Sequence, residues 1–477
     1  MTQQRVAGLL AAVLLSACAT PGHLSPPQET LKGAAIGLSA DNAAKEPALA
    51  ERWWEVFGDA ALDQLIDKAL QDNPSLAAAG ARLRRAAAAV ARVESNDTAQ
   101  VAARFDATSQ RFPEHALYPP NIAGTHQEIG SLQAGLSWEL DFFGRNKAAL
   151  EAALGSVHAA QADAQGARLL LASSVTRNYL QLARLLEQRR IALRTFEQRS
   201  EVLALTRRRV QAGLDTAIEL RQGEGALPDT RQAIEALDEQ IVLRRHALAA
   251  LAVQPPTAMD GLAPQLLALH GAQLPERLPA DLLGRRADID AARLRVEAAT
   301  QELKAARADF YPSINLIAFA GYNAIGLNRL LEAGSEQYGA GPALRLPLFD
   351  GGRLRSALQG RAAELDLAIA AYNGALLEAV RETSDQIASL QSIARQQEQQ
   401  DLAQLSAESA YALAVRRYEA GLGSYLIVLS TESAVLIQRR SHADLLARAL
   451  DSQVELMRAL GGGYVADALA DPLHARR

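Results

Sequence analysis

The sequence predicts a mainly α-helical protein with four amphipathic strands, built from two copies of one unit. The phrase RRVQAGL at 208–214 returns as RRYEAGL at 416–422. The Gly-Arg pair at 144–145 returns at 352–353, again 208 residues later. In each copy a long segment without a strong helix breaker follows the Gly-Arg pair, and alternating apolar and polar residues precede it. An offset shared by separate matches is typical of an internal duplication.

The long segments cover 145–213 and 353–421 and are rich in Ala, Leu, Glu, Gln and Arg, which favour helix. At ~1.5 Å per residue, each helix would be about 100 Å long. Apolar residues recur at spacings of three, four and seven, as in a coiled coil, although Arg189 and Arg207 fall on the apolar seam. A large soluble helical bundle would explain the same periodicity.

The strands are predicted from period-two alternation. Leu132, Leu136 and Trp138 belong to one apolar series that ends at Phe142, and the second copy repeats the series from Tyr338 to Leu348. Weaker candidates lie at about 101–111 and 313–323. Strands of about ten residues with one apolar face are typical of outer-membrane barrels, although a half-buried soluble sheet is the alternative. Four strands cannot close a barrel, and lipid does not tolerate an open edge, so several chains must combine their strands.

The N-terminus predicts export. Arg5 precedes an apolar stretch and small residues, which together form a signal peptide. The only cysteine, Cys18, follows at the cleavage point, and LSAC at 15–18 resembles the bacterial lipobox. Cleavage there would leave a covalent diacylglycerol and a fatty acyl group on Cys18. Ala19 favours an outer-membrane address, because lipoproteins of the inner membrane usually carry aspartate at this position.

Other functions find little support. The net charge is −5 without a basic block, which argues against a nucleic-acid partner. The eight histidines are scattered, so no metal site is expected. There is no phosphate-binding glycine loop and no nucleophile motif, so we expect neither an enzyme nor a cofactor.

An ordered series of phrases resembles the outer-membrane factor (TolC-like) family, especially its NodT-type efflux lipoproteins. In chain order these phrases are WWEVFGDAALDQLI, LSWELDFFGR, ALAALAVQPP, LPERLPADLLGRRADI, ARADFYPSINL, LPLFDGGR, RRYEAGLGSYLIVL and ALGGGY. They run through nearly the whole mature chain, and their order makes the resemblance specific.

The resemblance implies a homotrimer with a 12-stranded outer-membrane β-barrel, four strands per chain, continued by a 12-helix periplasmic coiled-coil tunnel. Such a trimer would be the passive exit duct of a tripartite efflux system. Its partners would be a periplasmic adaptor, an inner-membrane pump of the resistance-nodulation-division type and outer-membrane lipid. The alternatives are a duct for type I protein secretion and, in a different class, a structural coiled-coil lipoprotein.

The resemblance also assigns residues to the two periplasmic tips. Glycine suits the left-handed turn that ends a helix, and basic residues suit the last helical turn, so capping explains part of the repeat. The adaptor-docking residues would be Arg209, Gly213, Leu214, Arg417, Gly421 and Leu422. The gate residues would be Leu426, Ile427, Ser430 and Glu219. Because Ile427 and Ser430 stand where relatives carry acids, we expect an apolar constriction at Leu426.

The predicted boundaries define two repeats with their flanking segments. Pro228, inside the first return helix, predicts a bend or frayed turn that has no counterpart in the second copy. The boundaries, in chain order, are a signal peptide at 1–17, a lipidated tether at 18–50, a first repeat at 51–253 (β-hairpin at about 101–143, helical hairpin at 145–252), a Pro-rich linker at 254–283, a second repeat at 284–461 (β-hairpin at about 313–350, helical hairpin at 353–460) and a flexible tail at 462–477.

Overall fold

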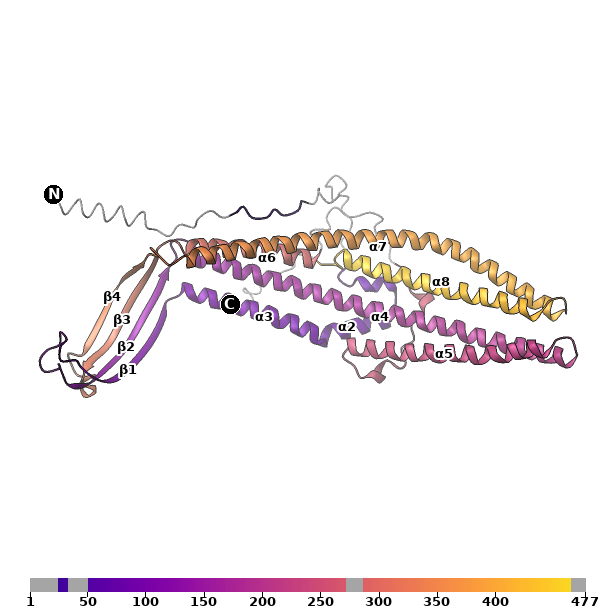
Figure 1. Ribbon diagram of the computed structural model, residues 1–477, viewed down its shortest axis with the longest axis horizontal. Helices are drawn as coiled ribbons and strands as arrows, with labels where there is room; N and C mark the ends of the chain where they lie inside the picture. The colour runs from indigo at the N-terminus through magenta and orange to yellow at the C-terminus, as the bar shows by residue number, and fades with distance from the viewer. Residues whose placement is uncertain (1–24, 33–49, 272–285, 465–477) are drawn as a thin grey trace. The chain divides into compact units, whose positions relative to one another are not determined.

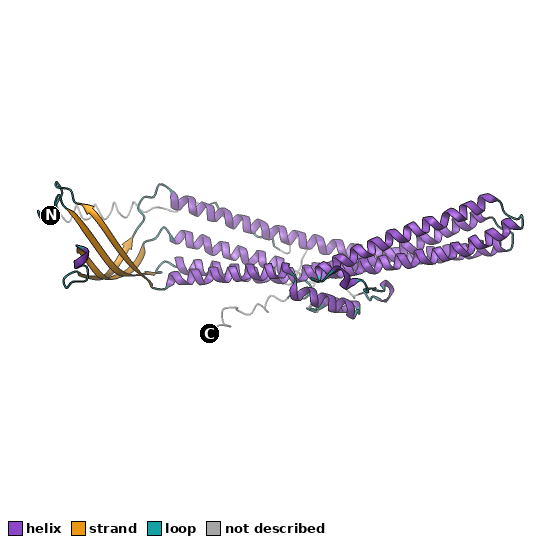
Figure 2. Ribbon diagram, turned by 90° about the horizontal axis from the view of Figure 1, so that it is seen from below, coloured by secondary structure: helices purple, strands orange, loops and turns teal. Residues whose placement is uncertain are grey.

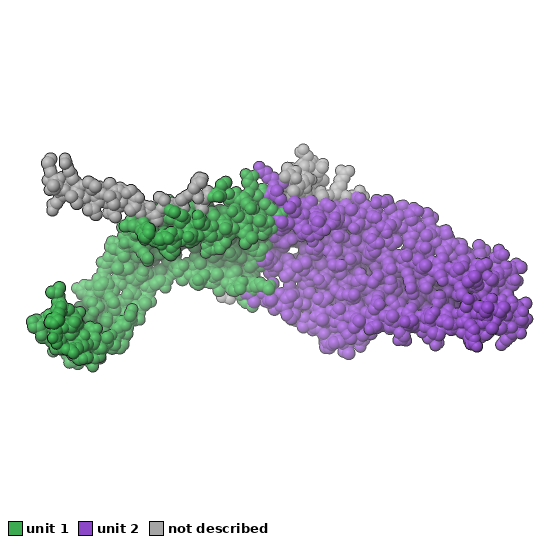
Figure 3. Space-filling model, in the orientation of Figure 1, with its two compact units in different colours: residues 1–30, 82–160, 291–373 green, residues 31–81, 161–290, 374–477 purple. Residues whose placement is uncertain are grey.

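The computed structural model describes residues 25–32, 50–271 and 286–464. Cys18, the signal peptide and most of the C-terminal tail lie outside these residues. The chain divides into two compact units (Figure 3). Unit 1 comprises 1–30, 82–160 and 291–373, and unit 2 comprises 31–81, 161–290 and 374–477.

Unit 1 contains one four-stranded antiparallel sheet in the order β1-β2-β3-β4 (Figures 1 and 2). Its two central strands come from different copies of the duplicated unit. The strands are β1 (Gln100–Arg111), β2 (His126–Leu140), β3 (Ser313–Ile325) and β4 (Glu336–Arg345). This confirms four strands per chain, and each has the ten or so residues that a tilted strand needs to cross a membrane.

Two strands end earlier than the alternation predicts. β2 stops at Leu140 because Asp141 turns to the following helix, where its carboxylate accepts a hydrogen bond of 2.8 Å from the Lys147 amide. β4 stops at Arg345, two residues before Pro347, which has no N–H to donate to a ladder.

The strand register places the apolar series on one face of the sheet. Leu132 lies between Phe105 and Tyr322, and the same face continues through the pair Ala318 and Ala340. The opposite face carries mostly polar residues. We call these the apolar face and the polar face. This separation requires the register to be correct across all four strands, because a slip of one residue exchanges the faces.

Four helices form two long hairpins whose lengths repeat. The helices are α4 (Arg145–Gln211), α5 (Ala217–Leu251), α7 (Arg353–Glu419) and α8 (Tyr425–Ala459). Both outgoing helices have 67 residues and both return helices have 35. The two copies of the repeat therefore share their helix lengths as well as their sequence phrases.

The helix α5 is continuous through Pro228, so the expected frayed turn is wrong, while the expected bend stays a prediction. A proline inside a helix removes one backbone hydrogen bond. Gly223 and Thr230, on either side of it, are buried, and this packing holds the helix in place. The arginines on the predicted seam are also satisfied within this hairpin. Arg189 pairs with Asp238, and Arg207 lies 3.5 Å from Glu224.

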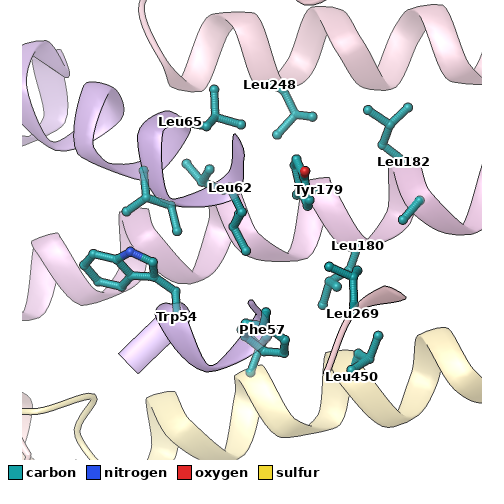
Figure 4. Close-up of a cluster of buried hydrophobic side chains, with 14 of the residues drawn as sticks. Trp54, Phe57, Leu62, Leu65, Tyr179, Leu180, Leu182, Leu248, Leu269 and Leu450 are labelled. Carbon is teal, nitrogen blue, oxygen red and sulfur yellow. The ribbon is translucent and has the colours of Figure 1, made fainter. Parts of the chain in front are cut away.

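The main core of unit 2 gathers around the short 3-10 helix η3 (Trp53–Phe57) and α2 (Ala60–Asp72). Figure 4 shows Phe57 and Leu62 in this core together with Tyr179 of α4, Leu248 of α5 and Leu450 of α8. The N-terminal segment therefore packs against helices from both hairpins.

The remaining helices are α3 (Pro74–Glu94) and α6 (Ala287–Ala308). In unit 1 a smaller core joins Leu303 of α6 and the following Phe310 to Leu354 and Leu358 at the start of α7. The helix that precedes the second β-hairpin is thus packed against the helix that follows it.

Candidate functional site

The two tips turn with the same backbone geometry. Gly213 and Gly421 have φ of 73° and 74°, in the left-handed region that glycine adopts without strain. The Leu214 amide donates to the Arg209 carbonyl at 2.9 Å, and the Leu422 amide donates to the Arg417 carbonyl at 2.8 Å. These are the bonds of a glycine-terminated helix, so the repeated letters encode the turn.

The side chain of Arg209 joins the two hairpins. Its Nε and Nη2 donate to the carboxylate of Asp215 at 2.8 and 3.2 Å. Its Nη1 donates at 3.0 Å to the backbone carbonyl of Tyr418, in the other hairpin. The guanidinium carbon lies 4.6 Å from the centre of the Tyr418 ring. Arg209 therefore binds the C-terminal end of α7 while it remains paired within its own tip.

Tyr418 completes this contact from the second hairpin. Its hydroxyl donates to Asp215 Oδ2 at 2.5 Å and lies 2.9 Å from the Thr206 hydroxyl. The side chains of Arg209 and Asp215 are only 11% and 10% exposed. We call Thr206, Arg209, Asp215 and Tyr418 the tip latch. Shielding from water strengthens its charge-assisted hydrogen bonds.

The two tips differ where their letters differ. At the offset of 208, Gly423 occupies the position of Asp215, and Val210 occupies that of Tyr418. Among the residues that the structure describes, the side chain of Arg417, the counterpart of Arg209, donates only to the Leu422 carbonyl in its own turn, at 3.3 Å. The residues that the two copies share thus form the same turn in each tip. The residues that differ between the copies form a single latch between the tips.

The latch holds its protonation states over a wide pH range. The hydrogen bond from Arg209 lowers the pKa of Asp215, and the bond from Tyr418 acts in the same direction. Burial, followed by the hydrogen bond to Asp215, raises the pKa of Tyr418 to about 12. At neutral pH Asp215 is therefore an anion and Tyr418 a hydrogen-bond donor.

A second contact between the hairpins lies further along the helices. Arg199 of α4 donates to Glu432 of α8 at 2.9 Å and to the Thr230 hydroxyl of α5, also at 2.9 Å. Glu432 is buried, and burial raises its pKa although Arg199 opposes the shift. Sequence analysis missed this pair because Arg199 and Glu432 are separated by 233 residues.

The predicted gate residues lie at the start of the return helices. Leu426 and Ile427 are exposed on the first turn of α8, and the Ser430 hydroxyl donates to the Ile427 carbonyl at 3.0 Å. Glu219 instead accepts a hydrogen bond of 2.9 Å from the Thr216 amide. Together they form the capping box of α5, which a Thr-x-x-Glu spacing could have revealed.

The predicted docking residues fall into two groups. Leu214 and Leu422 are exposed at the two turns, next to the glycines. The Arg209 side chain is only 11% exposed and its guanidinium is engaged in the latch, which leaves little of it for a partner. Arg417, also a predicted docking residue, is exposed together with Arg208 and Arg416, so the surface of the tips combines exposed leucines with basic side chains.

Two further observations concern the described residues. They contain no helix that is both long and apolar enough to cross a membrane. Within the same parts of the chain, no cluster of His, Cys, Asp and Glu could hold a metal ion.

Four strands that continue into two long helical hairpins with linked tips define the class of outer-membrane channels with the TolC-like fold. The chain belongs to the outer membrane efflux protein family, whose profile matches residues 65–252 and 278–462. This assignment confirms the family that the sequence phrases indicated.

The chain is similar to two bacterial proteins, one named for resistance and one for export. It is 37% identical over 363 residues to the fusaric acid resistance protein FusA of Burkholderia cepacia, covering 74% of this chain and 68% of FusA. It is 33% identical over 458 residues to the pyoverdine export outer membrane protein OpmQ of Pseudomonas putida, covering 95% of this chain and 96% of OpmQ.

The fold is also that of a solved outer-membrane protein. The crystal structure of VceC from Vibrio cholerae matches with a TM-score of 0.81 at 34% identity, covering 87% of this chain and 99% of VceC.

Proposed function

We propose that this protein is the outer-membrane exit duct of a tripartite efflux system. The observation that carries the proposal is the combination of four amphipathic strands with two 67-residue helices in one chain. A sheet with one apolar face suits a membrane, and helices of about 100 Å suit a tunnel across the periplasm.

The open sheet supports a homotrimer. The smallest membrane barrels need about eight strands, and an unpaired strand edge in lipid is costly. Three chains together supply twelve strands for one barrel and twelve long helices for one tunnel. In this trimer the apolar face contacts outer-membrane lipid, and the polar face lines the lumen.

The tips are the proposed site of docking and gating. The exposed leucines Leu214 and Leu422 would contact the periplasmic adaptor, which in turn binds an inner-membrane pump of the resistance-nodulation-division type. Leu426, with Ile427 beside it, would close the pore by apolar packing. The tip latch would keep the two hairpins of each chain together in the closed state.

Small molecules are the proposed cargo. The names of FusA and OpmQ refer to fusaric acid and pyoverdine, which favours small-molecule efflux over the secretion of proteins. Energy would come from the pump, because the duct offers a passage and no chemistry.

Conductance through planar lipid bilayers tests both the function and the gate. The purified full chain is expected to form trimers that need detergent for extraction and that conduct ions at a low level. Leu426→Ala should raise this conductance about twofold or more, because it removes an apolar constriction.

The control is Leu413→Ala, which truncates another exposed leucine, on α7, away from the proposed constriction. A wild-type trimer without conductance would refute the channel. Equal conductance of Leu426→Ala and wild type would refute the gate assignment alone.

The lipid anchor on Cys18 is proposed from the sequence, and this residue lies outside the described part of the chain. Cys18→Ser is expected to abolish incorporation of labelled palmitate completely, because a hydroxyl cannot form the thioether that precedes acylation. Cells grown with labelled palmitate provide the measurement. Label retained by the Cys18→Ser protein would rule out the anchor.

A further inference from the structure

A cavity of about 370 Å³ lies in unit 1, where β2 and β4 end and α4 and α7 begin. Its volume is in the range of sites that hold small molecules. Three arginines and a pair of aromatic rings contribute to its lining. They are Arg145, Arg345, Arg353, Phe143 and Tyr311.

One of the three arginines is already neutralised. Arg145 lies 2.7 Å from Glu139 and 3.7 Å from Asp309, both of which also line the cavity. The remaining two, Arg345 and Arg353, are exposed and have no ion pair or side-chain hydrogen bond to any residue that the structure describes. Arg353 interacts with the charge of Asp350 just before α7, but Asp350 does not line the cavity.

The cavity lining carries three acids against its three arginines, so its formal charge is balanced, but the acids are held by other groups. Glu139 and Asp309 are engaged by Arg145, and Asp141 accepts the Lys147 amide at 2.8 Å. Arg345 and Arg353 are therefore the two guanidinium groups of the lining whose donors are available to an incoming anion. A planar guanidinium suits a carboxylate, to which it can donate two parallel hydrogen bonds.

The aromatic pair provides a second recognition element. Phe143 and Tyr311 are stacked, with ring centres 5.0 Å apart and an interplanar angle of 12°. About half of each side chain is exposed. Their accessible surfaces can pack against a further aromatic ring.

The strand register places the cavity on the polar face of the sheet. Arg345 is paired with Ser313, and Glu139 is paired with Asn315, in positions that alternate with the apolar face. If the polar face lines the lumen, as the proposed function requires, permeating molecules pass this cavity where the barrel meets the tunnel.

We propose that this cavity is a binding site for small aromatic carboxylates in the lumen. Arg345 and Arg353 bind the carboxylate, and Phe143 with Tyr311 packs against the ring. The duct thereby favours anionic aromatic cargo at one point of its path. This inference rests on the proposed function.

Block of single-trimer conductance by benzoate tests the site in the full-length wild-type channel. Benzoate is expected to block in a concentration-dependent manner, and Arg345→Gln combined with Arg353→Gln should raise the half-blocking concentration about tenfold or more. Phe143→Leu should raise it about threefold. Benzamide, which has the ring without the charge, and acetate, which has the charge without the ring, should both block more weakly.

The matched control is Arg104→Gln. Arg104 is also on the polar face, opposite Gln133, but it pairs with Asp106 at 2.7 Å and does not line the cavity. Its loss should leave the benzoate block unchanged. An equal effect of Arg104→Gln would indicate diffuse lumen charge and overturn the site, as would equal block by benzamide. A conducting wild type without benzoate block refutes the site alone, whereas a wild type that does not conduct refutes the channel.

Discussion

Asp215→Ala is expected to raise the open fraction of the channel on the order of tenfold or more. The substitution removes the acceptor of two hydrogen bonds from Arg209 and of one from Tyr418. A hydrogen bond to a charged group contributes about 1.5–3 kcal/mol, and about 1.4 kcal/mol changes a population tenfold. Solvent screens these bonds little, because both charged side chains are about nine-tenths buried. Single-channel recording measures the open fraction.

Asp229→Ala is the matched control, because Asp229 is an exposed aspartate on α5, outside the latch. It should leave the open fraction at the wild-type level. If Asp215→Ala and Asp229→Ala have the same open fraction, the latch does not hold the closed state.

The pH dependence of the wild type provides a second readout of the same latch. Because the folded pKa of Asp215 is lowered, its contribution is fully present above the ordinary aspartate pKa of about 3.9 and is lost only as the pH falls through the lowered value. Because the pKa of Tyr418 is raised to about 12, its proton stays in place below the ordinary tyrosine pKa of about 10. The latch therefore predicts gating that is constant between about pH 5 and 8. If the open fraction of the wild type rises within this pH range, titratable groups outside the latch control the gate.

Phe57→Ala is expected to cause the largest loss of stability among the substitutions considered. Phe57 is 0% exposed, in the core that η3 and α2 share with α4, α5 and α8. Truncating a buried phenylalanine costs about 3–5 kcal/mol, because the transfer energy is lost and a cavity remains. Aromatic residues make up only 5% of this chain, so its alanine-rich helices have few large side chains to fill that space. Thermal unfolding in detergent, followed by circular dichroism, measures the change.

The neighbouring Val56→Ala is the control, because Val56 is 40% exposed. Its truncation should change the midpoint of thermal unfolding little, since an exposed side chain loses less apolar contact. Equal midpoints of Phe57→Ala and wild type would show that this segment does not hold the helices of unit 2 together.

The sequence predicts the fold well because its main features are local. The 208-residue offset reveals the duplication, and uninterrupted helix formers indicate the long helices. Period-two alternation locates the strands, although it extends β4 past Arg345, where Pro347 limits the ladder. The frayed turn expected at Pro228 was wrong, because buried neighbours outweigh the intrinsic cost of one proline, whereas the expected bend of the helix stays a prediction.

The candidate site was predicted only in part. The glycines of the tips were found because a left-handed turn depends on the residue itself. Tyr418 stands inside the phrase RRYEAGL, but its partner Asp215 is 203 residues away, and no spacing rule connects them. The useful signal was a difference between the two copies of the repeat. At the offset of 208 residues, Asp215 corresponds to Gly423 and Tyr418 corresponds to Val210.

The sequence alone thus determined the helices, the strands, the turns and the family, because each depends on neighbouring residues or on an ordered series of phrases. The tertiary structure decided which of two equivalent arginines, Arg209 or Arg417, bridges the hairpins. It also brought Arg345 and Arg353 into one cavity beside two stacked rings. Both outcomes depend on which distant side chains lie within hydrogen-bonding or packing distance, and only the packing of helices and the register of strands set that distance.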